Sequence, residues 1–248
     1  MNIGIMQIFL IAYFFIGVFP SWHENVSSCE IVFGLLKGFS YEVFNLTEFL
    51  YYISFFLFPV FLINAFWEKE KENKNEIAMF RIGCKEKWYE QIYKVGLVSV
   101  IKFYLCYIAG LVITIVCCLC VCKGNNLEYL KELLDFYEAS DTQVYSLAIG
   151  SILFKGLEIV LLYEINLLLY CYTKQTIFSF LGTMSIYVLG SLEGFNFFRV
   201  GKASVYQLLE DIQVKGNIVD LSIIIQIGIL VILLIINHIG GKRYGECN

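Results

Sequence analysis

The sequence predicts an all-α membrane protein with six transmembrane helices and both termini in the cytoplasm. Hydrophobic residues make up 58% of the 248-residue chain and charged residues only 16%, whereas soluble domains are about half apolar and a quarter charged. The apolar residues gather into stretches of about twenty with few charges, which is the length that crosses a bilayer as a helix. This composition excludes a soluble enzyme, a nucleic-acid-binding domain, a disordered chain and a small disulfide-rich secreted domain. The net charge of −4 gives no reason to expect a polyanionic partner.

The six expected spans form one domain that covers residues 1–248. The first span is closed by Pro20, and neither a preceding basic residue nor a small-residue cleavage site marks it as a signal peptide. The second contains Pro59, which lacks a backbone donor, so we expect a kink there. The full set of expected spans is 2–19, 49–67, 95–122, 144–172, 177–192 and 221–239.

The distribution of Lys and Arg orients the expected bundle. Seven of the 18 basic residues lie in the loop 68–94, and Lys174, Lys242 and Arg243 fall on the same side of the membrane. The opposite side holds six basic residues. Because cytoplasmic loops carry the excess of Lys and Arg, we expect this loop and both termini inside the cell.

Two outer segments are longer than simple turns. Residues 125–141 alternate leucines and acidic residues at helical spacing, which predicts an amphipathic helix lying on the outer surface or packed on the bundle as a connector. Residues 193–220 begin Gly-rich and continue with a short helical patch from about Tyr206 to Ile212.

Four charged residues lie within the apolar stretches: Lys102, Lys155, Glu158 and Glu164. A charge at membrane depth costs about 2.5–3.5 kcal/mol on insertion scales, so such residues usually face protein or water. Lys155 and Glu158 are three positions apart and therefore share a helical face. We keep two interpretations: a polar substrate path formed by Lys155, Glu158 and Glu164, or an intrahelical ion pair that lets this helix insert.

No catalytic or metal-binding pattern is found. Four of the nine cysteines, at 117, 118, 120 and 122, crowd one helix and point in several directions, which favours packing over tetrahedral metal binding. The two histidines, His23 and His238, fall on opposite sides of the predicted membrane, and no phosphate-binding loop occurs. We therefore expect a chain without catalytic residues or bound metal.

The loop 68–94 is the most informative stretch. Its first half, from Glu68 to Glu76, is strongly polar, and its second half brings Phe80 and Trp88 to either side of Gly83. This pattern predicts a helix, a turn, a short helix and a return into the membrane. Aromatic side chains between basic residues suit a protein–protein contact, or Trp88 and Tyr89 anchor the following span at the lipid surface.

With this loop and its six spans, the chain resembles the type-2 ABC exporter permeases. The stretch from Phe80 to Lys94 is similar to the arginine–glycine–serine–basic–tryptophan pattern common in that family in Firmicutes, although Cys84 stands where serine is usual. The resemblance implies a coupling helix that docks on a separate ATPase subunit. The implied ATPase-interface residues are Phe80, Arg81, Gly83, Cys84, Lys85, Lys87, Trp88 and Tyr89.

The same resemblance implies the partners and the location. These are two copies of an ABC ATPase subunit that bind ATP and magnesium, and a second permease, identical or a sister chain, in a bacterial plasma membrane. The expected cargo is amphipathic: a peptide such as an antimicrobial peptide, a lipid or a drug. The alternative is a stand-alone membrane protein for immunity or sensing, without an ATPase.

Overall fold

The computed structural model describes residues 3–18, 27–40, 44–82, 85–121, 141–192, 200–201, 203–209 and 226–237. Within these ranges the regular structure is helical, as predicted. The labelled helices are α1 (Ile3–Val18), α2 (Ser28–Leu36), α3 (Leu46–Ile82), α4 (Lys85–Val121), α6 (Asp141–Thr173) and α7 (Thr176–Ser191), and Gln226–Asn237 forms a further apolar helix.

Each of the six predicted spans falls on a helix, but six membrane crossings are not confirmed. Of the described helices, only two have an apolar stretch long enough to cross a bilayer: Leu46–Lys69 in α3, with 24 residues, and Ile92–Val121 in α4, with 30 residues. The apolar helices Gly4–Val18, Thr176–Ser191 and Gln226–Asn237 have between 10 and 17 residues. The long helix α6 carries Lys155, Glu158 and Glu164 within its apolar part.

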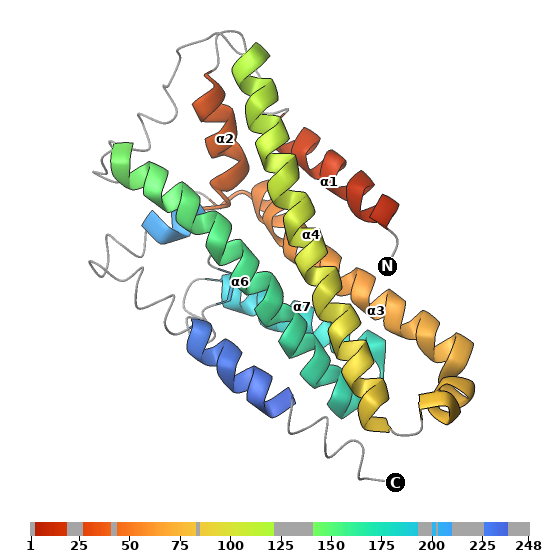
Figure 1. The fold of residues 1–248 in the computed structure, drawn as a ribbon. Helices are drawn as coiled ribbons and strands as arrows, with labels where there is room; N and C mark the ends of the chain where they lie inside the picture. Colours follow the sequence, from red (N-terminus) through yellow and green to blue (C-terminus); the bar gives the residue numbers. More distant parts are fainter. Residues whose placement is uncertain are drawn as a thin grey trace.

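The long helices α3, α4 and α6 and the helix α7 alternate in direction along the bundle (Figure 1). The α3–α4 pairing is antiparallel, since Phe55 packs against Tyr107 and the later residue Phe58 against the earlier Phe103. Figure 1 accordingly shows the end of α3 and the start of α4 at the same end of the molecule. The α6–α7 pair is antiparallel as well and turns at Lys174, which has a positive φ of 55°.

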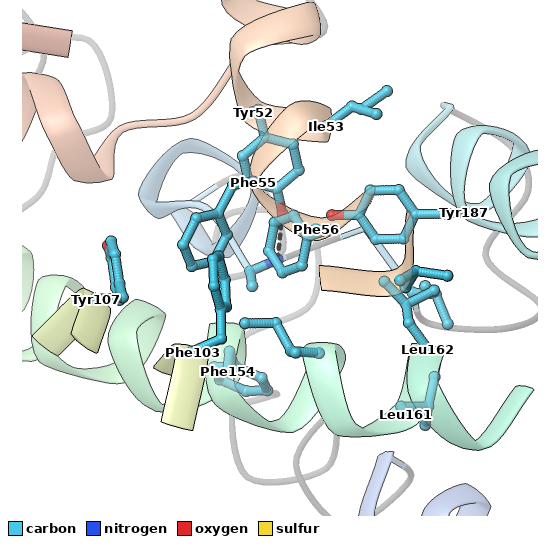
Figure 2. Close-up of a cluster of buried hydrophobic side chains, with 14 of the residues drawn as sticks. Tyr52, Ile53, Phe55, Phe56, Phe103, Tyr107, Phe154, Leu161, Leu162 and Tyr187 are labelled. Carbon is cyan, nitrogen blue, oxygen red and sulfur yellow. Dashed lines mark hydrogen bonds between the residues drawn. The ribbon is translucent and has the colours of Figure 1, made fainter. Parts of the chain in front are cut away.

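Aromatic side chains fill the centre of the bundle. Figure 2 shows Phe55 and Phe56 of α3 between Phe103 and Tyr107 of α4 on one side and Tyr187 of α7 on the other. All five side chains are buried. Aromatic pairs of this kind stabilise a fold beyond the burial of their apolar surface, because the edge of one ring contacts the face of another. This cluster therefore fixes how α3, α4 and α7 pack.

A cap of short segments closes the end of the bundle opposite the α3–α4 turn. Ser27 caps α2 by accepting a hydrogen bond from the Glu30 backbone N–H at 3.2 Å, half of the capping-box pattern. The predicted helical patch near Tyr206 is confirmed where the structure describes it, because residues 205–209 are helical. The Tyr206 N–H donates to the Lys37 carbonyl at 3.1 Å, which ties this patch to the end of α2.

The prediction for 125–141 lies outside the described residues, apart from Asp141, which begins α6. Pro59 lies inside α3, and the helix continues past it to Ile82.

Candidate functional site

The loop residues predicted to meet an ATPase lie at the junction of α3 and α4. Phe80 and Arg81 occupy the last turn of α3, while Lys85, Lys87, Trp88 and Tyr89 occupy the first turns of α4. Gly83 and Cys84 lie outside the described residues. The predicted short helix is not a separate element: α4 runs without a break from Lys85 to Val121, so the short helix is its first turns.

Both helices extend well beyond their apolar stretches at this junction. The apolar part of α3 ends at Lys69 and the helix continues over 70–82, which adds about 20 Å at 1.5 Å per residue. The apolar part of α4 begins only at Ile92. The two candidate spans are therefore joined by a polar helical hairpin, residues 70–91.

A second candidate site is the interior around α6, where polar side chains are enclosed by the bundle. Lys155 and Glu158 are 1% exposed, and Glu164 and Asn166 are fully buried. Residues 161–167 are all buried in an unbroken run. Because a helix segment buried on every side lies in the middle of a bundle, this part of α6 is enclosed by the other helices, and the polar residues of α6 face protein as predicted.

Lys155 lies in an aromatic environment. Its ammonium donates to the Tyr107 hydroxyl at 3.3 Å and lies 5.7 Å from the centre of the Phe55 ring and 5.6 Å from that of Tyr107. Such ring faces attract a cation through their negative face. The predicted ion pair with Glu158 is not among the ion pairs of the described residues. Instead, the Tyr187 hydroxyl donates to Glu158 Oε2 at 3.5 Å.

Glu164 lies on the other side of α6. It is nine positions after Lys155, which at 100° per residue places it about half a turn away around the helix. Its carboxylate accepts from the Tyr93 hydroxyl of α4 at 3.1 Å and from Asn237 Nδ2 of the helix Gln226–Asn237 at 2.5 Å. Asn237 also donates to the Glu164 carbonyl at 3.2 Å.

The three predicted path residues therefore do not form one group. Lys155 and Glu158 face α3, α4 and α7, whereas Glu164 connects α6 to α4 and to the helix Gln226–Asn237. A path along α6 would involve the first two residues and would leave Glu164 on its far side.

Sequence reasoning missed a polar layer of uncharged residues between α3, α6 and α7. Asn166 Oδ1 accepts from Asn64 Nδ2 at 3.0 Å, from Ser179 Oγ at 2.6 Å and from Thr183 Oγ1 at 3.3 Å. All four side chains are buried. Asn166 Nδ2 and Asn64 Oδ1 are buried and have no partner in the described part of the chain. Asn166 follows Lys155 by eleven positions and therefore lies on the same side of α6. The sequence signal was an Asn inside each of two apolar stretches.

The cysteines on α4 behave as packing residues where they are described. Cys118 is buried beside Ile31, while Cys117 and Cys120 are exposed. Cys122, His23 and His238 lie outside the described residues.

Comparison of the chain with protein-family models, with curated proteins and with solved structures finds no match.

Proposed function

We propose that this chain is the membrane-spanning permease subunit of an ATP-driven exporter in a bacterial plasma membrane. A separate ATPase subunit would bind ATP and magnesium and would act on this chain through the polar hairpin 70–91. The exported cargo would be amphipathic: a peptide, a lipid or a drug.

The observation that carries this proposal is the continuity of the two candidate spans with the hairpin. A displacement of residues 80–82 and 85–89 would be transmitted into the bundle core, because α3 is unbroken up to Ile82 and α4 is unbroken from Lys85. Phe55 of α3 and Tyr107 of α4 lie in contact there, and Tyr107 holds Lys155. The hairpin is thus mechanically linked to the buried polar residues of α6.

The surface of the bundle supports a lipid environment. Large apolar side chains are exposed along α1, α4 and α7, including Ile8 and Ile11 at 70% and Ile113 at 63%. Soluble monomers rarely expose contiguous apolar surface on this scale. The buried polar residues of α6 are the part of the chain suited to contact cargo with polar groups.

The test is co-purification from detergent of the tagged chain expressed together with its genomic neighbours. We expect an ATPase subunit with a nucleotide-binding fold to be recovered. The variants Trp88→Ala and Gly83→Pro should reduce its recovery at least tenfold while membrane insertion is retained, and Lys69→Ala, outside the hairpin, should not. Recovery of the ATPase that is unchanged in both hairpin variants would contradict the coupling role, and its repeated absence would favour a stand-alone immunity or sensor protein.

A further inference from the structure

One face of α4 is exposed along almost its whole apolar length. Within the candidate spans, 61% of an 18-residue apolar segment of α3 is buried in the bundle, against only 17% of such a segment of α4. The exposed face contains a stripe whose members are spaced alternately three and four residues apart: Val95, Val98, Lys102, Leu105, Ala109, Val112, Val116 and Leu119. This is the spacing at which one helix packs along another. We call these residues the α4 stripe.

Lys102 is the charged residue of the α4 stripe, and it lies deep in the apolar stretch. The preceding exposed lysine on α4, Lys94, is paired with Glu90 at 2.6 Å and marks the polar end of the helix. Lys102 follows eight residues later, about 12 Å further along the axis at 1.5 Å per residue. The four-carbon stem of lysine covers roughly half that distance, so the ammonium of Lys102 does not reach the Lys94–Glu90 pair.

Among the side chains that the structure describes, the ion pairs are Lys37–Glu48 and Lys94–Glu90, and none of them includes Lys102. Lys155, the other lysine at this depth, is enclosed by Tyr107 and Phe55 instead. A charge at membrane depth is costly unless it faces protein or water, and such charges usually pair with one another. Lys102 therefore needs a partner from outside the described bundle.

We propose that the α4 stripe is the docking surface for a transmembrane helix of a second, non-identical chain that carries a carboxylate at the depth of Lys102. The inference rests on the proposed function, because it requires α4 to cross a bilayer, and it specifies the second permease as a sister chain. A single lysine in an otherwise apolar seam selects the partner and its register at a cost in stability.

A second copy of this chain cannot provide a carboxylate partner for Lys102 of the α4 stripe. Two copies inserted with the same topology would pack their α4 helices in parallel, which would place Lys102 against Lys102, and like charges repel. The only carboxylates within the predicted spans are Glu158 and Glu164, and both are buried inside the bundle at 1% and 0% exposure. Neither can reach the α4 stripe of another copy.

The first experiment places a photo-crosslinking amino acid at Val98 or at Leu105, one turn to either side of Lys102, so that the lysine stays in place. The chain is expressed in cells with its genomic neighbours, irradiated, and the crosslinked peptides are identified by mass spectrometry. The same probe at Ile177, an exposed residue of α7, is the control for a different face. We expect both α4 probes to crosslink to one transmembrane segment of a different chain, with an Asp or Glu within one turn of the crosslinked residue.

Three outcomes would overturn the proposal: crosslinks from the α4 probes to lipid alone, to a second copy of this chain, or to a segment without an acidic residue. An equal yield of the same partner from the Ile177 probe would also overturn it, because the contact would then not be specific to the stripe.

The second experiment tests the charge. Lys102→Glu should lower recovery of the crosslinked partner at least tenfold and Lys102→Arg should retain it, while replacing the partner's carboxylate by lysine should restore recovery with Lys102→Glu. Unchanged recovery with Lys102→Glu would refute the charge pairing. Recovery of the ATPase is measured in the same samples. Absence of the ATPase from the samples of the unmodified chain and of every variant would contradict the proposed function. Loss of the sister chain from the Lys102→Glu sample alone would support this inference.

Discussion

Gly96 on α4 packs against Tyr163 of α6, and its replacement by alanine tests the register of the two helices. A Cβ atom at Gly96 would lie 2.5 Å from Tyr163 Oη and 2.6 Å from Tyr163 Cε2. Tyr163 has little freedom to move, because it is fully buried and its hydroxyl donates to the Tyr93 carbonyl at 2.8 Å.

Overpacking of this kind costs about 1–3 kcal/mol, and the better helix propensity of alanine returns up to about 1 kcal/mol. We therefore expect Gly96→Ala to lower the free energy of unfolding by about 1–2 kcal/mol. Gly150 on α6 is the matched control, since a Cβ there meets nothing within 4 Å, and Gly150→Ala should raise the same free energy by about 0.5–1 kcal/mol.

The assay is equilibrium unfolding in detergent micelles, followed by far-ultraviolet circular dichroism. Combining Gly96→Ala with Tyr163→Phe removes the nearest clashing atom. The loss of unfolding free energy in the double variant should therefore be smaller than the sum of the two single losses by at least about 0.5 kcal/mol. Should Gly96→Ala prove as stabilising as Gly150→Ala, the α4–α6 contact described here would be wrong.

Three further predictions concern buried polar groups and the cap. Asn166→Ala should lower stability by about 1–2 kcal/mol, because Asn64, Ser179 and Thr183 lose their shared acceptor, and the effect should be smaller in an Asn64→Ala background. Gly38→Ala should destabilise the cap more than an ordinary surface change, because Gly38 has a φ of +77° and its Cβ would lie 2.1 Å from Ser204 Cβ; faster proteolysis between 200 and 209 would report it. Lys155→Met, an apolar change of similar length, should lower both transport and the melting temperature, because it leaves the carboxylate of Glu158 buried without the positive charge one turn away; an unchanged melting temperature together with normal transport would contradict any role for Lys155.

The helices could be predicted from the sequence, including the continuation of α3 beyond its apolar stretch. The predicted span ended at residue 67 and a polar helix was expected to follow it, and α3 runs from Leu46 to Ile82. Residues 68–82 have good helix formers such as Glu and Lys, so the helix continues after the apolar stretch has ended.

The polar interior could be predicted in part. Counting charges found Lys155, Glu158 and Glu164, and their burial is confirmed. Their partners were not predictable from spacing within one helix, because Tyr107 and Tyr187 come from α4 and α7. The Asn166 layer was not predicted, because an uncharged amide within an apolar stretch does not show which other helices supply its hydrogen-bond partners. Whether the hairpin and the α6 residues act in transport stays a prediction.

The complete enclosure of residues 161–167 has a consequence for biosynthesis. Each charged side chain costs about 2.5–3.5 kcal/mol at the centre of a lone helix in lipid, and α6 carries three within its apolar part. Of the groups that satisfy them, Tyr107 precedes α6 in the chain, but Tyr187 and Asn237 are synthesised after it. We therefore expect α6 to become stably inserted only as a hairpin with α7 and against an α4 already in place, so that a helix enclosed by others in the finished bundle is among the last to settle in the membrane.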